Sequence, residues 1–538
     1  MRTVTRSIRT TLALALLAVA QLSHGADQDF AATLQTLPGA SYAEKDELIK
    51  ELAAARAPGT RAFLSALLEG QVYTRTSDAK IFIAHSDAAG LVLTDPLSGK
   101  PGGTAAADGF EKVGINNRLR KTLRVAIAQF DLASPDVATR SAAVDEMLRS
   151  LDDTTVKLLR ERVIVEANAG IKRSIETGLA LADLSDGSAQ ARLAAIGKLR
   201  GSLNPDVHNR LTELSDPANE SDPAVRAAAA AAVRHIDSWR TFYSGVQTLF
   251  FGLSLGSVLV LAAIGLAITF GVMGVINMAH GELMMLGAYT TYVTQLLMPN
   301  HIGASVIVAV PAAFLVSGLF GVAIERGIVR FLYGRPLETL LATFGLSLVL
   351  QQLVRDVFSA NNRPVETPQW MTGTWDINEA LSITNNRLVI VLFTVWVFAI
   401  LLLVLKYTRL GLEVRAVSQN RPMARAMGIR AEWVDALTFG LGSGIAGVAG
   451  VALSQLTNVG PNLGQSYIVD SFMVVVFGGV GNLWGTLISG MSLGIVNKVL
   501  EPYAGAVLGK ILVLVFLILF IQRRPRGLFP QKGRAAEG

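Results

Sequence analysis

The chain has 538 residues, of which 51% are hydrophobic and only 17% charged, whereas soluble domains carry about a quarter charged residues. Cysteine is absent, which excludes disulfides, thiol catalysis and cysteine-based metal sites. The net charge of +6 gathers in short segments beside apolar runs. That pattern is typical of cytoplasmic membrane loops and argues against a nucleic-acid-binding face.

The first 25 residues have the pattern of a secretory signal peptide. Three arginines precede an apolar core at 11–20, and small residues at 23 and 25 form a cleavage site. The alternative is an uncleaved membrane anchor, but the core is shorter than the roughly 20 residues that span a bilayer. We therefore expect cleavage and a periplasmic location for the domain that follows, 26–240.

Residues 26–240 are predicted to be helical, with a hairpin or loop in the turn-rich stretch 79–103. From about residue 130 an Arg-x-x-Ala pattern recurs at Arg140, Arg192 and Arg226, each time after a turn that suits a helix start. This pattern predicts stacked helix pairs of the HEAT type, with an ordinary helical bundle as the alternative. No catalytic cluster stands out, so we expect a docking or spacer domain.

The second half is expected to be a membrane domain, 241–530, followed by a cytoplasmic tail at 531–538. Positive charges place the connections around 326–335 and 406–430 and the segment after 522 in the cytoplasm. A periplasmic start and a cytoplasmic end require an odd number of crossings. The fold class predicted is therefore all-α, a polytopic helical membrane protein with about nine crossings behind an extracytoplasmic helical domain. The nine predicted spans are 248–270, 279–298, 305–329, 338–357, 387–405, 432–456, 467–480, 484–500 and 506–521.

Two positions in the membrane half suggest a substrate path. Between the first two spans, Gly271 and Gly274 precede Asn277, His280 and Glu282. This pattern favours a broken helix facing a cavity, because irregular backbone at membrane depth is tolerated only there. The alternative is an ordinary cytoplasmic turn.

The second position is Asp470, an acid inside an apolar stretch whose far end is broken by Gly478, Gly479 and Gly481. An intramembrane acid is a candidate functional residue. The alternative is that Asp470 caps a helix or pairs near the periplasmic interface. The glycine-rich segment 440–450 is expected to serve helix packing.

The loop 408–430 predicts a short docking helix on the cytoplasmic side. Asn420 can cap it, Pro422 suits its first turn and Gly428 can end it. Arg421 and Arg425 are four residues apart and are expected to share a face. The alternative is a solvated basic loop.

Three segments resemble permeases of the branched-chain amino acid ABC transporter family: INMAHGELMMLGAY (276–289), TRLGLEVRAVSQNRPMARAMGI (408–429) and VDSFMVVVFGGVGNLWGT (469–486). The resemblance implies that the stretch from Arg415 to Gly428 is the coupling segment that contacts an ATPase subunit. It also implies a second permease subunit, two ATP-binding subunits and a periplasmic solute-binding protein as partners. The N-terminal extension and the segments 341–347, 361–370 and 458–467 resemble the urea-transport branch.

The residues agree with a transport subunit that is not itself an enzyme. No P-loop motif is present, so energy must come from a partner, and no cofactor or metal is expected. Neutral groups at Asn277, Thr343, Gln351 and Asn458 would suit urea or short amides. Amino-acid zwitterions would need both signs of charge, and Glu282 and Asp470 offer only one. The alternatives are a branched-chain amino acid or short-amide permease, or a stand-alone urea channel.

Overall fold

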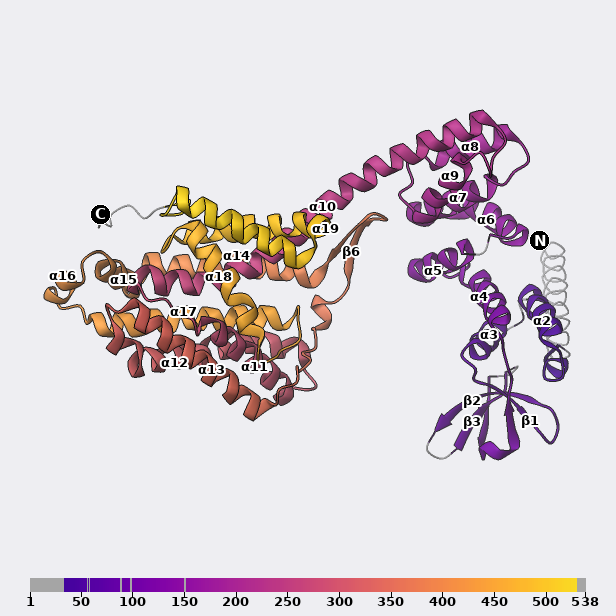
Figure 1. The fold of residues 1–538 in the computed structure, drawn as a ribbon. Coiled ribbons are helices and arrows are strands. Elements are labelled where there is room, and N and C mark those ends of the chain that lie inside the picture. The colour runs from indigo at the N-terminus through magenta and orange to yellow at the C-terminus, as the bar shows by residue number, and fades with distance from the viewer. Residues whose placement is uncertain are drawn as a thin grey trace, which may run out of the picture. The chain divides into compact units, whose positions relative to one another are not determined.

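The computed structural model describes residues 33–529, apart from 56, 58, 88–89, 97–98 and 150. The predicted signal peptide and the tail 531–538 lie outside the described residues. The chain forms two compact units, Met1–Ile236 and Asp237–Gly538, and helix α10 (Pro223–Met273) belongs to both (Figure 1). We describe each unit by itself.

The N-terminal unit contains a sheet, so the all-α prediction is wrong there. After α2 (Tyr42–Ala55) and α3 (Thr60–Leu68), five antiparallel strands pair in the order β4-β3-β2-β1-β5. Buried Leu91 and Leu93 flank the exposed Val92, an alternation that places one face of the sheet against the core. The stretch 79–103 supplies the β2–β4 hairpins. The strands are β1 (Val72–Arg75), β2 (Ile81–Asp87), β3 (Gly90–Thr94), β4 (Pro101–Ala105) and β5 (Phe110–Lys112).

The rest of this unit is helical, and side chains cap several of its helix starts. The Asp136 carboxylate accepts a 2.8 Å hydrogen bond from Thr139 N, and Asn168 caps α7 in the same way. Helices α5, α8 and α10 each follow one of the three predicted turns. The helices are α4 (Asn117–Asp131), α5 (Val137–Leu148), α6 (Asp153–Val165), α7 (Ala169–Asp183), α8 (Ala189–Leu199) and α9 (Pro205–Ser215).

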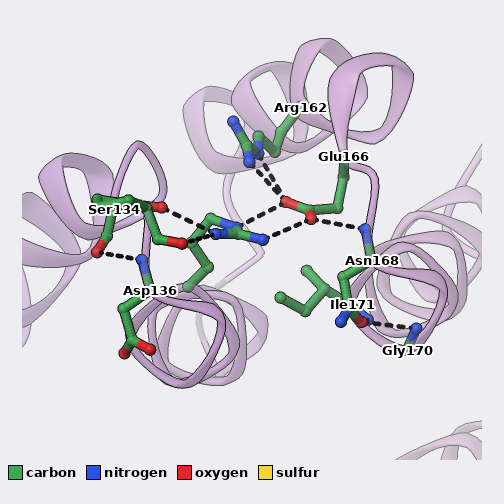
Figure 2. A network of polar contacts seen from close by, with 9 residues as sticks. Ser134, Asp136, Arg162, Glu166, Asn168, Gly170 and Ile171 are labelled. Atoms are coloured by element: carbon green, nitrogen blue, oxygen red, sulfur yellow. Dashed lines mark hydrogen bonds and ion pairs between the residues drawn. The ribbon is translucent and has the colours of Figure 1, made fainter.

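Two of the recurring arginines, Arg140 and Arg192, tie the start of one helix to the start of another, and Arg226 donates to carbonyls of the turn before its own helix. Arg140 donates to the Ser134 carbonyl at 2.9 Å and to both oxygens of Glu166, which also accepts from Arg162 and from the Asn168 N–H (Figure 2). Arg192 repeats the arrangement with the Asp186 carbonyl at 2.8 Å and Glu220 at 3.1 Å. The motif therefore has a structural role, whereas its HEAT-type classification stays a prediction.

The second unit is a helical bundle, and all nine predicted apolar segments are helical. Within the described residues, six helices are long and apolar enough to cross a membrane: α10, α12, α13, α14, α17 and α19. The last two predicted spans form α19, which Gly505 interrupts with a φ of 75°. The main helices are α11 (His280–Leu297), α12 (Ile302–Gly327), α13 (Pro336–Phe358), α14 (Asn385–Tyr407), α17 (Ala431–Ser454), α18 (Leu463–Gly478) and α19 (Leu483–Arg523).

Helix α17 occupies the centre of this unit and packs most extensively against α11 and α12 (Figure 1). Small residues allow the close approach, as expected for 440–450. A Cβ on Gly287 of α11 would lie 2.0 Å from the Gly447 carbonyl oxygen, and one on Gly450 would lie 2.0 Å from the Met284 carbonyl oxygen. We call this contact between α11 and α17 the glycine seam.

Shorter elements connect the long helices. A 3-10 turn, η2 (Val329–Leu332), follows α12, and a hairpin of β6 (Thr374–Asn378) and β7 (Leu381–Thr384) precedes α14. Helices α15 (Arg409–Gln419) and α16 (Arg421–Ala426) lead from α14 to α17.

Candidate functional site

The predicted helix break lies between α10 and α11. Helix α10 ends at Met273, Gly274 adopts a φ of 69°, and α11 begins at His280. The fully buried Asn277 accepts a 3.0 Å hydrogen bond from Ala279 N, and Thr343 of α13 accepts one of 3.1 Å from Met278 N. Side chains therefore satisfy backbone donors that the broken helix leaves free.

Glu282 lies in the first turn of α11 and is 1% exposed. Its Oε1 accepts hydrogen bonds from Ser347 Oγ at 3.0 Å and from Gln351 Nε2 at 2.8 Å, both on α13. Its Oε2 has no hydrogen-bond partner among the described residues. One side of the carboxyl group is thus held by α13, and the other remains available.

His280 and Asn277 also keep one unpaired polar atom each. The His280 Nε2 lies 2.9 Å from the Ala262 carbonyl, which only accepts, so Nε2 carries the proton and Nδ1 is an acceptor. Neither Nδ1 of His280 nor Nδ2 of Asn277 has a partner within the described part of the chain. Buried polar atoms are normally hydrogen-bonded, so these three atoms need water or a ligand.

The predicted path residues fall into separate places. Asn277, Glu282, Thr343 and Gln351 gather where α11 and the break before it meet α13, and we call them, with Ser347, the α11–α13 cluster. His280 lies on the other side of α11, against Ala262 of α10. Sequence reasoning missed Ser347, although its spacing of four from Gln351 on a helix could have revealed it. Asn458 is exposed in the loop after α17 and has no contact with the cluster that the described residues record.

Asp470 on α18 pairs with a lysine that the sequence did not indicate. Lys510 Nζ, from the second half of α19, lies 2.9 Å from Asp470 Oδ2. The pair borders a cavity of about 190 Å³, so both signs of charge face it, contrary to the expectation of acids alone. The cavity is lined by Leu255, Leu259, Ser466, Tyr467, Asp470, Asn497, Glu501, Ala506 and Lys510.

The glycine-broken ends lie in close helix contacts. Helix α18 ends at Gly478, and Gly479 and Gly481 have φ of 99° and 76°. A Cβ on Gly271 would lie 2.3 Å from the Gly481 Cα atom. These glycines therefore permit the turn between α18 and α19 and allow α10 to pack against that turn.

The predicted docking helix is α16, with Asn420 accepting from Met423 N at 3.0 Å and Gly428 at a φ of 88° just after it. Its two arginines do not share a free face. Arg421 turns inward to the buried Asp435 of α17, whereas Arg425 is exposed and lies 3.8 Å from Glu432. Arg415 of α15 donates to the Leu405 carbonyl at the end of α14.

Comparison with known proteins identifies the class that this helical bundle represents. A family model described as branched-chain amino acid transport system / permease component matches residues 248–521, half of the chain. The chain belongs to this family and is a multi-pass membrane transport subunit, which confirms the resemblance seen in the sequence.

Its relatives include curated permeases of several bacteria. LivH of Escherichia coli K12, a high-affinity branched-chain amino acid transport system permease protein, is 32% identical over 293 residues, 53% of this chain and 94% of LivH. BraD of Pseudomonas aeruginosa, with the same description, is 30% identical over 296 residues, 53% of this chain and 96% of BraD. The ribose import permease RbsC of E. coli is 26% identical over 271 residues, 47% of this chain and 77% of RbsC. No solved structure matches the chain.

Proposed function

We propose that this chain is the permease subunit of an ATP-driven importer and that its substrate is the small neutral solute urea. The observation that supports this proposal is the α11–α13 cluster, with buried unpaired atoms on Asn277 and Glu282, and a third such atom on His280, which lies against α10. They include an N–H donor and two acceptors. Urea combines N–H donors with a carbonyl acceptor and would satisfy both kinds of group.

The proposal includes an assembly and a topology. A second permease, two ATP-binding subunits and a periplasmic solute-binding protein complete the importer in the inner membrane. The chain crosses the membrane nine times, with α11, α18 and both halves of α19 among the crossings, and its N-terminal unit lies in the periplasm. Family membership and the charge distribution of the loops support this arrangement.

A branched-chain amino acid is the second candidate substrate, and one observation favours it. The cavity beside Asp470 and Lys510 offers both signs of charge, as the ammonium and carboxylate groups of an amino acid require. The names of LivH and BraD point the same way.

The substrate is tested by uptake in cells that lack other urea and leucine transporters and express the full set of subunits. We expect uptake of labelled urea, weak competition by short aliphatic amides, and no leucine uptake. Leucine uptake without urea uptake would establish the second candidate. Urea uptake that persists without the ATP-binding subunits would instead indicate a stand-alone channel.

A matched pair of neighbours on α13 tests the site itself. Gln351→Ala removes a hydrogen bond to the buried Glu282, and we expect uptake to fall about tenfold, as for a lost hydrogen bond to a charged group. Gln352→Ala alters the next residue, which faces away and bonds Asp356, and should leave uptake within about twofold. Equal uptake in the two variants would remove the α11–α13 cluster from the path.

A further inference from the structure

The segment formed by α15 and α16 is tied to α17 by a small apolar cluster, which includes Val414, Ala424 and Val434, and by one ion pair with a buried carboxylate. Arg421, the first residue of α16, reaches Asp435 in the second turn of α17 with both terminal nitrogens, one to each carboxylate oxygen. Asp435 is 1% exposed and the Arg421 side chain 28% exposed. A two-pronged contact of this kind fixes orientation as well as distance.

Aromatic rings extend this contact to neighbouring elements. The Arg421 guanidinium lies 4.4 Å from the centre of the Tyr333 ring, just after η2. Two residues before Asp435, Trp433 lies 4.3 Å beneath the guanidinium of Arg326 at the end of α12. Two cation–π contacts and the ion pair thus hold together the end of α12, the residue after η2 and the starts of α16 and α17.

The outer side of helix α16 exposes large apolar side chains. Met423 is 60% exposed, and Met427, which directly follows the helix, is 78% exposed. The inner side carries Arg421, the buried Ala424 and the half-exposed Arg425, which lies 3.8 Å from Glu432 of α17. The outer side is available to a partner, while the inner side is occupied by contacts within the chain.

Helix α17 connects this end of the bundle to the α11–α13 cluster. Its glycine seam leaves no room for a side chain between α17 and α11, so the backbones of the two helices lie in direct contact. Glu282 and His280 lie on α11. A displacement of α17 therefore changes the position of the cluster.

We propose that the Arg421–Asp435 pair is a positioning contact that makes α16 and α17 move as one body. Through it, displacement of α16 by an ATP-hydrolysing partner reaches α11 and the solute path. This inference rests on the proposed function. It also changes the expected role of Arg421: the outer side of α16, with Met423 and Met427, faces the partner, and Arg421 transmits the movement.

The test uses the complete importer in lipid vesicles and compares basal ATP hydrolysis with hydrolysis stimulated by the solute-loaded binding protein. For Arg421→Gln and Asp435→Asn we expect normal co-purification of the ATP-binding subunits, basal hydrolysis within twofold of wild type, and at least tenfold less stimulation. The double variant should lose no more than either single one, because each change breaks the same contact. Arg421→Lys keeps the positive charge but cannot form the two parallel hydrogen bonds to Asp435, so this variant should retain part of the stimulation.

The control is Arg335→Gln, which breaks an exposed ion pair with Glu338 and should keep full stimulation. Wild-type stimulation in the single variants, or losses that add in the double variant, would overturn the positioning role. If the single variants fail to insert, stimulation that Arg421→Lys reduces supports the proposal, and full stimulation in that variant overturns it. If no ATP-binding subunit co-purifies with the wild-type chain, the proposed function is refuted instead.

Discussion

At the scale of single residues, Glu166 shows how the N-terminal unit stabilises a buried charge. Burial alone raises the pKa of this carboxyl group, but hydrogen bonds from Arg140, the Asn168 N–H and Arg162 outweigh burial and lower the pKa to about 2. A carboxyl group whose pKa falls on folding stabilises the fold at pH values above its unfolded pKa of about 4.5. That contribution is lost as the pH falls from about 4.5 towards 2.

We predict that Glu166→Gln destabilises α5–α7 by about 2–3 kcal/mol at neutral pH, because Arg140 and Arg162 lose their negatively charged partner. Hydrogen exchange of the amides in α5–α7, measured on the full chain in detergent, should be clearly faster in the variant. The difference from wild type should shrink as the pH is lowered from 6 to 3, where wild-type Glu166 loses its own contribution. Glu176→Gln, at an exposed position of α7, is the control. A gap between Glu166→Gln and wild type that does not depend on pH would show that charge is not the cause.

Some candidate residues could be predicted from the sequence and others could not. Glu282 and Asp470 stand out because a charge in an apolar run is costly. Lys510 does not, because it lies in the second half of α19, 40 residues after Asp470, and only the fold makes them neighbours. The inward orientation of Arg421 also depends on a tertiary partner, Asp435, and the helical spacing of Arg421 and Arg425 gives no sign of it.

At the scale of elements, the glycine seam is the contact most sensitive to added volume. We predict that Gly287→Ala destabilises the purified protein by about 1–3 kcal/mol, since its Cβ would overlap the Gly447 carbonyl oxygen. Gly345→Ala on α13, where no atom lies within 4 Å of the added Cβ, should be neutral or slightly stabilising. Thermal unfolding of both variants in detergent makes the comparison. Equal unfolding temperatures would mean that α11 and α17 can separate at no cost.

The sequence also predicts elements unevenly. The membrane helices are identified by their long apolar runs, and capping residues such as Asp136 and Asn420 mark helix starts correctly. The sequence predicts only a hairpin or loop where the five-stranded sheet forms, because the strands are three to seven residues long and β4 (Pro101–Ala105) is rich in glycine. Such strands form only through pairing with their neighbours, which local pattern does not encode.

At the scale of the whole molecule, topology is the open prediction, and the lack of cysteine makes it directly testable. Single cysteines at Glu176, Arg335 and Arg526, all exposed, would be probed in intact cells with a membrane-impermeant maleimide. We expect labelling of Glu176→Cys only, with the other two labelled after permeabilisation. Labelling of Glu176→Cys and Arg526→Cys from the same side would require an even number of crossings and would refute the nine-crossing topology together with signal cleavage.

The arginine contacts of the N-terminal unit bear on the order in which the chain folds during synthesis. Arg140 and Glu166 are 26 residues apart, and Arg192 and Glu220 are 28 apart, so each contact can close soon after its second partner has crossed the membrane. The membrane unit relies on partners much farther apart, such as Thr394 and Ser257 at 137 residues. The helices of the N-terminal unit can therefore pack one after another while the membrane bundle is still being synthesised.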